Sequence, residues 1–293
     1  MSIYQELKDS FKFGSTLTKL LYINIIAFIS FKLVFVFFWA TGNDAQFPFS
    51  RWLCAPAYFP SLLYKPWTVI TYMFYHEDFL HIAFNMLGLY WFGKLFLDFL
   101  NKRQLVGIYL LGGISGYILF SLGYYFIPAL QEHLLGARIL GASAAVFAIL
   151  SAVAFYRPNY TIYLMFIGPA KLKYIALVYI LLDVLMMASG NAGGHISHLG
   201  GVLFGWLFAL QYSKGRDVTN GINGIIDYMV TMLKPRKNLK VSHKKPSNDL
   251  DYNLIKNKEQ KDIDSILEKI SKAGYESLSK DEKEKLFNMS KKK

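Results

Sequence analysis

Three polar side chains stand in apolar segments of the sequence. They are Asn85 in HIAFNM, Ser143 in GASAAVF and His198 in HLGGVLFG. A hydroxyl, an imidazole and an amide are the groups that acyl transfer at a peptide carbonyl requires as nucleophile, general base and oxyanion donor. Because polar groups at membrane depth are costly, we interpret these three residues as a functional site inside a membrane.

The surrounding sequence predicts an all-α membrane protein. Its hydrophobic fraction is 54% and its mean hydropathy is +0.28, which is typical of a multi-pass integral membrane protein. Six apolar stretches each approach the roughly 20 residues that a spanning helix needs, and the fourth and sixth are shorter than the others. The predicted spans cover approximately residues 18–41, 79–100, 104–127, 140–156, 171–189 and 197–213.

The charge pattern predicts how the chain is oriented. The net charge of +12 would favour nucleic-acid binding in a soluble protein, but here the basic residues flank the spans and fill the chain after Lys214. With both termini in the cytoplasm, the outer loops keep only Arg51, Lys65 and Arg138. We therefore expect the lipid bilayer to be a partner and nucleic acid not to be one, and we expect the bacterial inner (plasma) membrane as the location.

This orientation brings the candidate residues to one depth. Spans two, four and six all enter from the outside, so that His81, Ser143 and His198 each fall within about the first turn of a helix. His81 and Asn85 are four residues apart and share a helical face. Small residues surround Ser143 and follow His198, which lets the two helices approach closely enough for a hydroxyl–imidazole hydrogen bond.

In this order and at these depths, the residues resemble the rhomboid family of intramembrane serine proteases. The resemblance covers roughly residues 66–213. The elements that carry it are His81-x-x-x-Asn85, Gly141-x-Ser143 and His198-x-x-Gly201-x-x-x-Gly205.

The resemblance implies a six-helix rhomboid-like bundle and a specific set of roles. Ser143 and His198 would form a catalytic dyad without an acidic third member. His81, Asn85 and the backbone N–H of Ser143 would bind the oxyanion, and His76 would help to hold the site together. The family's Gly-x-Ser-Gly ends here in Ala144, and a frequent tyrosine is replaced by Phe147, which keeps the ring that packs on the imidazole.

The function that follows is a serine endopeptidase that cuts peptide bonds in or near transmembrane segments of other membrane proteins. The resemblance suggests substrates with helix-destabilising residues and a small side chain before the cut. The alternative is a catalytically silent rhomboid-like protein that binds membrane clients. A channel or transporter would call for inverted repeats, which the sequence does not display convincingly. Oligomeric state is left open.

Two histidine pairs raise the question of a metal. His76 and His81 resemble a zincin motif, but they are five residues apart, which on a helix places them about 140° out of phase. His195 precedes His198 by three residues, yet no cysteine or suitably spaced carboxylate joins them, so His195 is interpreted as a structural histidine at a loop end. Asp183 is interpreted as a buried hydrogen-bonding residue. We therefore expect no metal and no cofactor.

The sequence after the spans changes character. The predicted domains are a core at 1–213, a basic linker at 214–247 and a cytoplasmic tail at 248–293 with a short helical hairpin. Within the tail we expect disorder around 248–260, an amphipathic helix at 262–273, and a second helix started by the capping box from Ser279 to Glu282.

The single cysteine, Cys54, excludes an internal disulfide. It falls in the long first outer loop, from Gly42 to Lys65, which could lie in the membrane interface. An impermeant maleimide added from outside should reach it unless the loop is buried.

Overall fold

The computed structural model describes residues 2–42, 49–164, 168–188, 190–233 and 249–290. It divides into two compact units, Met1–Lys234 and Pro235–Lys293. The second part of the predicted linker, residues 234–247, lies outside the described part of the chain.

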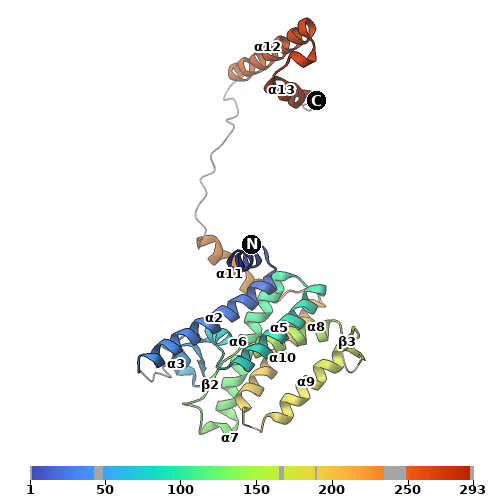
Figure 1. Ribbon diagram of the computed structural model, residues 1–293. Helices are drawn as coiled ribbons and strands as arrows, with labels where there is room; N and C mark the ends of the chain where they lie inside the picture. Colours follow the sequence, from blue (N-terminus) through green and yellow to red (C-terminus); the bar gives the residue numbers. More distant parts are fainter. Residues whose placement is uncertain (1, 43–48, 165–167, 189, 234–248, 291–293) are drawn as a thin grey trace. The chain divides into compact units, whose positions relative to one another are not determined.

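The first unit is mostly helical (Figure 1). Its elements are α1 (Ile3–Phe13), α2 (Thr16–Ala40), α3 (Phe49–Leu53), β1 (Ala55–Pro56), η1 (Phe59–Leu63), α4 (Thr68–Thr71), η2 (Tyr72–Phe74), α5 (Phe79–Phe99), α6 (Lys102–Phe126), α7 (Pro128–Gln131), β2 (Arg138–Ile139), α8 (Ser143–Tyr156), β3 (Thr161–Leu164), β4 (Gly168–Lys171), α9 (Leu172–Met186), α10 (Ala192–Tyr212) and α11 (Asn220–Leu233).

Helices lie at all six predicted spans. By length and composition, three of the described helices are long and apolar enough to cross a membrane, namely α2, α5 and α6. Helix α8 is apolar but has only 14 residues, and α9 has 15. A membrane protein is therefore supported, whereas the count of six spans stays a prediction.

The sixth span begins earlier than expected. Helix α10 starts at Ala192 rather than near 197, because the side chain of Asn191 caps it by accepting a hydrogen bond from the Gly194 N–H. The prediction that this span is short was wrong, since α10 has 21 residues. His195 consequently lies inside the helix and not at a loop end.

Two small antiparallel sheets depart from the all-α prediction. Strand β3 pairs with β4, and β1 pairs with β2 through Ala55–Ile139 and Pro56–Arg138. The second pairing ties the first outer loop to the segment that leads into α8. The Ala57 N–H extends it by donating to the carbonyl of Ala137 at 3.0 Å.

Helix α8 packs on both α6 and α10 and also contacts α5. Ten of its 14 residues are buried, because small side chains line its contacts. A Cβ on Gly201 or Gly205 of α10 would collide with the carbonyl oxygens of Ala144 and Ala148. A Cβ on Gly116 of α6 would lie only 2.5 Å from the Cβ of Ala144. Glycine at these positions is what permits the helices to approach so closely.

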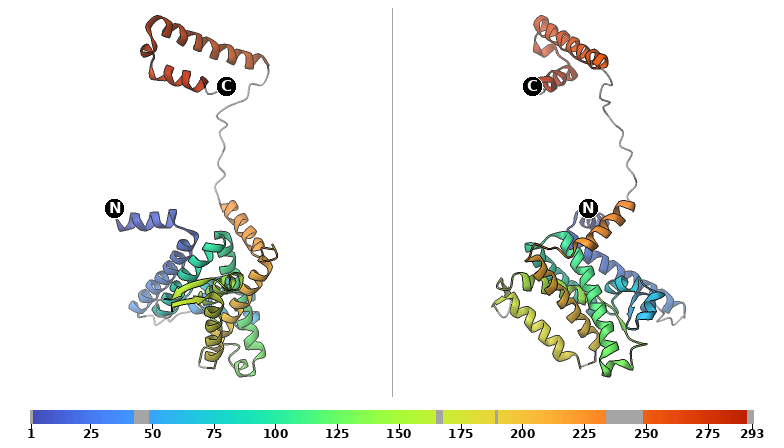
Figure 2. Two further views of the ribbon diagram at one scale, coloured as in Figure 1. Left: turned by 90° about the vertical axis from the view of Figure 1, so that its right-hand side faces the viewer. Right: turned by 180° about the vertical axis from the view of Figure 1, so that it is seen from behind.

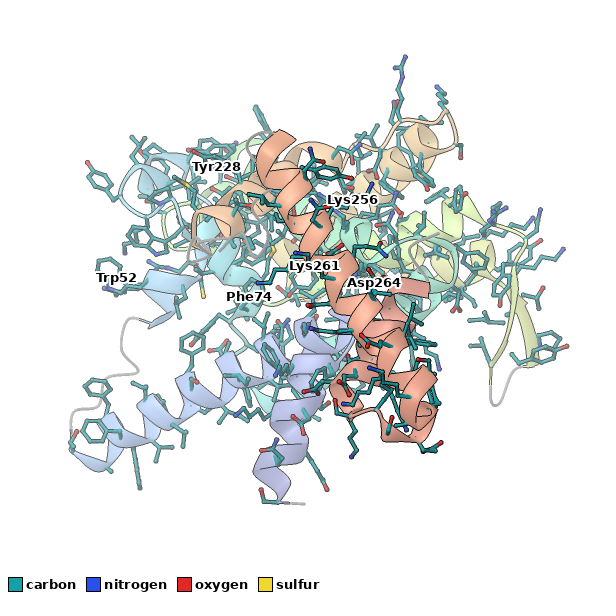
Figure 3. The ribbon with its side chains drawn as sticks, turned by 90° about the horizontal axis from the view of Figure 1, so that it is seen from above. Trp52, Phe74, Tyr228, Lys256, Lys261 and Asp264 are labelled. Atoms are coloured by element: carbon teal, nitrogen blue, oxygen red, sulfur yellow. The ribbon has the colours of Figure 1, made fainter. Side chains whose placement is uncertain are left out.

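Aromatic contacts hold the described residues 49–65 of the predicted first outer loop against Trp67. Trp52, labelled in Figure 3, stacks on Trp67 with ring centroids 6.0 Å apart, and the ammonium of Lys65 lies over the Trp52 ring. Cys54, two residues after Trp52, is only 1% exposed. Maleimide was expected to reach Cys54 unless the loop is buried, and at Cys54 the loop is buried.

Helix α11 falls within residues predicted as linker. It packs on α6, where Gly107 lies against Thr219 and Arg103 pairs with Asp227. The ordered part of the first unit therefore extends past residue 213.

The second unit contains α12 (Asp249–Ala273), η3 (Tyr275–Ser277) and α13 (Lys280–Ser290), and α12 and α13 fold back on each other (Figure 2). The predicted capping box is present, since Ser279 and Glu282 exchange backbone and side-chain hydrogen bonds. The expectation of disorder near 248–260 was wrong for the described residues, where α12 is continuous. Charged side chains such as Lys256, Lys261 and Asp264 project along it (Figure 3).

Burial makes the thiol of Cys54 react slowly with maleimide. Loss of solvation raises its pKa to about 12, so little thiolate forms at neutral pH. We expect a maleimide to label Cys54 at least about tenfold more slowly than a cysteine at Tyr64, which is 79% exposed in the same loop. The measurement compares wild type with Tyr64→Cys in a Cys54→Ala background, in detergent. Equal rates would contradict the buried position.

Candidate functional site

A cavity of about 840 Å³ opens at the ends of α5, α8 and α10. Ser143, His198, His81, Asn85 and Phe147 all line it. The structure thus brings together four polar residues that the sequence places as far apart as 81 and 198. The sequence predicts that these side chains lie close together, and they do.

The hydroxyl of Ser143 and the imidazole of His198 are in hydrogen-bond contact, with Oγ and Nε2 2.7 Å apart. Ser143 is the first residue of α8, and the first N–H groups of a helix have no partner within it. These amides and the helix dipole favour negative charge beside Oγ. His198 is the seventh residue of α10, one turn deeper into its helix than expected.

The turn before Ser143 requires glycine. Gly141 has φ +98°, a conformation that L side chains rarely adopt. A Cβ there would lie 2.6 Å from Nε2 of His81, so a side chain would also displace that ring. The Gly141 N–H donates to the carbonyl of Tyr72 at 2.9 Å, which fixes the turn to the segment before α5.

His76 supports the same turn. Its buried ring accepts a hydrogen bond at Nε2 from the Ala142 N–H, at 3.3 Å. The phase argument applied to His76 and His81 was wrong in its premise, because α5 begins only at Phe79, with Asp78 as its cap. The two imidazoles instead meet edge to face, 5.2 Å between centroids. Burial, and then the neighbouring His81, lower the pKa of His76 to about 4, so the ring is neutral near pH 7.

Asn85 and Phe147 complete the lining. Asn85 is buried and donates one amide hydrogen to the carbonyl of His81 at 2.9 Å, which leaves its second amide hydrogen for other contacts. Phe147 stacks on the His198 ring, with centroids 4.5 Å apart and planes 6° from parallel. The aromatic ring expected against the imidazole is therefore in place without a hydroxyl.

A carboxylate reaches His198, contrary to the expectation that no acidic group would join it. Asp183 of α9 lies 3.0 Å from Nδ1 of His198 through each of its oxygens, and 2.6 Å from Nδ1 of His195. Asp183 is 6% exposed, which confirms its interpretation as a buried hydrogen-bonding residue. The sequence held no signal for the contact, because it arises from the way α9 packs on α10.

Comparison with known proteins identifies related chains. The family described as Rhomboid domain matches residues 64–215, and a family of unknown function (DUF6576) matches residues 247–292. RHOMBOID-like protein 12, mitochondrial, of Arabidopsis thaliana is 32% identical over 158 residues, covering 51% of this chain and 47% of that protein. Rhomboid protein 1, mitochondrial, of Saccharomyces cerevisiae is also 32% identical over 158 residues, covering 51% and 44%.

The chain thus matches less than half the length of each of these relatives. Their names place both relatives in mitochondria, so they lend no support to the expected bacterial inner membrane.

The glycine two residues before Ser143 offers a direct test of the turn. Gly141→Ala should lower the thermal unfolding midpoint and disturb the cavity, because it combines a strained φ with the His81 clash. Gly215→Ala is the matched control, since Gly215 has φ +77° with nothing within 4 Å of its Cβ. We expect it to cost about 1 kcal/mol and Gly141→Ala clearly more. Equal losses in thermal scans of the purified proteins would contradict the close approach of His81.

The neutral state of His76 predicts a pH dependence of stability. The unfolded chain takes up a proton near the ordinary pKa of 6.5, but the folded protein does so only near 4. The stabilisation from neutral His76 is therefore complete above pH 6.5 and is lost as the pH falls from 6.5 to 4, at most by about 1.4 kcal/mol per unit. His76→Gln should flatten this part of the profile, whereas His133→Gln, at an exposed site, should not. An unchanged slope in His76→Gln would refute the assignment.

Proposed function

The chain belongs to the rhomboid family, and from this premise we propose that it is an intramembrane serine endopeptidase. It would hydrolyse peptide bonds in or near the transmembrane segments of other membrane proteins. The observation that carries the proposal is the 2.7 Å contact between Ser143 Oγ and His198 Nε2 on the wall of an open cavity. This is the geometry that a serine needs to be activated by a neighbouring base.

In the proposed reaction, Nε2 of His198 accepts the Ser143 proton as Oγ attacks the carbonyl carbon of the substrate. The carbonyl π electrons move to oxygen and form the tetrahedral intermediate. The protonated His198 then gives its proton to the leaving amine, and an acyl-enzyme remains. Water, deprotonated by His198, hydrolyses the ester and releases Ser143.

The oxyanion would be stabilised by donors on residues that line the cavity. The backbone N–H of Ser143 stands at the start of α8, and Asn85 and His81 line the same space. Donors that are fixed before the reaction need not reorganise when charge develops, which is the source of their catalytic effect. Asn85 and His81 lie one helical turn apart on α5, so one rigid element holds both.

The substrate class follows from the surroundings of the site. Helix α9 presents a largely apolar exposed surface that includes Leu177, Leu181 and Leu185, as expected of a helix that faces lipid. A polypeptide that reaches Ser143 from that environment is itself a membrane segment. The proposed orientation, with basic loops and both termini inside, places Ser143 near the opposite surface.

A catalytically silent, client-binding rhomboid-like protein is the second candidate. It shares the fold and the cavity, but it has no need for a hydroxyl and an imidazole at hydrogen-bond distance. The retained Ser143–His198 contact therefore favours the protease.

We expect Ser143→Ala and His198→Ala each to lower cleavage of a generic transmembrane substrate by at least about 10³-fold, because the two groups act as a unit. The assay uses purified protein in detergent, and a fluorophosphonate probe should label wild type but not Ser143→Ala. Ser151→Ala is the control in the same helix, since its hydroxyl bonds to the Val202 carbonyl away from the cavity.

Two results would contradict the proposal. The first is substantial cleavage by either the Ser143 or the His198 variant, and the second is a wild-type protein that neither cleaves nor takes up the probe. Inhibition by EDTA would point instead to a metal-dependent reaction.

A further inference from the structure

The side chain of Asp183 lies between two imidazoles, at a depth where an isolated carboxylate would be costly. Its oxygens contact Nδ1 of His198 at 3.0 and 3.0 Å, and one of them also contacts Nδ1 of His195 at 2.6 Å. The side chains of all three residues are at least four-fifths buried. Polar groups that are retained in such a position are usually functional.

Both oxygens of Asp183 lie equally far from Nδ1 of His198, which indicates which ring nitrogen carries the hydrogen. A carboxylate only accepts hydrogen bonds, so Nδ1 of His198 must carry the hydrogen that lies between the two oxygens. In the neutral ring Nε2 is then the acceptor, and Nε2 is the atom that faces Ser143 Oγ at 2.7 Å. The carboxylate on one side of the ring therefore selects the tautomer that the hydroxyl on the other side requires.

The same three residues form a group that could in principle hold a metal ion. Tetrahedral zinc with bonds of 2.0–2.1 Å separates its ligand atoms by about 3.3 Å. The separations of 2.6 and 3.0 Å between Asp183 and the imidazole nitrogens are those of hydrogen bonds instead. A metal at Nδ1 of His198 would also take the place of the hydrogen that the carboxylate accepts.

His195 fixes the carboxylate itself. It lies one turn before His198 on α10, so both imidazoles project from one helical face towards α9. By donating to an oxygen that His198 also uses, His195 prevents Asp183 from rotating away. Phe147 stacks on the His198 ring, which leaves that ring held at Nδ1, at Nε2 and on one face.

We infer that Asp183 is a positioning residue for the proposed hydrolysis, and that His195 holds Asp183 in place. Asp183 keeps His198 in the Nδ1–H tautomer and stabilises the imidazolium that forms when Nε2 takes the Ser143 proton. The hydrogen on Nδ1 stays on His198, and Asp183 remains a carboxylate throughout. This inference rests on the proposed function, because it assigns a role in activating Ser143.

The test compares Asp183→Asn and Asp183→Glu with the control Asp98→Asn. Asp98 is an exposed carboxylate near the C-terminal end of α5, whereas His81 and Asn85 lie near its N-terminal end. Asn can donate to Nδ1 and so favour the wrong tautomer. We expect Asp183→Asn to lower kcat by about 10²- to 10⁴-fold, with KM changed less than about twofold, because Asp183 does not line the cavity. Asp183→Glu should recover at least about tenfold of that loss, and Asp98→Asn should match wild type.

Ser143→Ala in the same assay separates the two claims. If Ser143→Ala is inactive and Asp183→Asn keeps wild-type kcat, the inference fails and the proposed function stands. If Ser143→Ala is active, the proposed function fails. A loss in Asp183→Asn that appears in KM alone would also overturn the positioning role.

A second measurement needs no variant at position 183 to fold. The ¹⁵N shifts of histidine-labelled wild-type protein, with His198 assigned by the signals lost in His198→Gln, report which ring nitrogen carries hydrogen. We expect Nδ1 of His198 to be protonated and Nε2 to be free. The opposite tautomer would overturn the inference.

Discussion

The arrangement of the site depends on how closely α8 and α10 can approach each other. Gly201 and Gly205 bring the backbone of α10 against carbonyl oxygens of α8, where even a methyl group would not fit. Gly116 of α6 confines α8 from another side. Without a hydrophobic driving force between helices in lipid, such backbone contact and the dispersion energy it yields are what hold a bundle together. The contact between Ser143 and His198 is one result of that packing.

The second requirement is that polar groups inside the bundle satisfy one another. Ser143, His198, Asp183 and His195 form one chain of hydrogen bonds that runs from α8 through α10 to α9 and back to α10. Each hydrogen bond orients the next side chain, so this series fixes the geometry of the site and also stabilises the buried polar groups. It also explains why α9, whose outer face is exposed and apolar, carries one buried carboxylate on its inner face.

The sequence was informative where the signal was local or periodic. The positions of the apolar helices, the capping box at Ser279 and the pairing of Ser143 with His198 could be predicted, because apolar runs, cap residues and motif order are visible in one dimension. The partner of His198 could not be predicted, since Asp183 meets it only after α9 packs on α10. The start of α10 was misplaced although Asn191 offered a capping signal. The helical phase predicted for His76 and His81 was wrong, because it assumed a helix that extends past the cap at Asp78.

The length of α8 has a consequence for the access of water. Fourteen residues at 1.5 Å each give a helix of about 21 Å, whereas the hydrocarbon layer of a typical membrane is about 30 Å thick. Helices α5, α6 and α10 pack around α8, so the shortfall is met inside the protein, by side chains and by water in the cavity beside Ser143. A hydroxyl at the first residue of so short an enclosed helix can be reached by water within the bundle, so the supply of water to Ser143 depends on the cavity and not on the lipid.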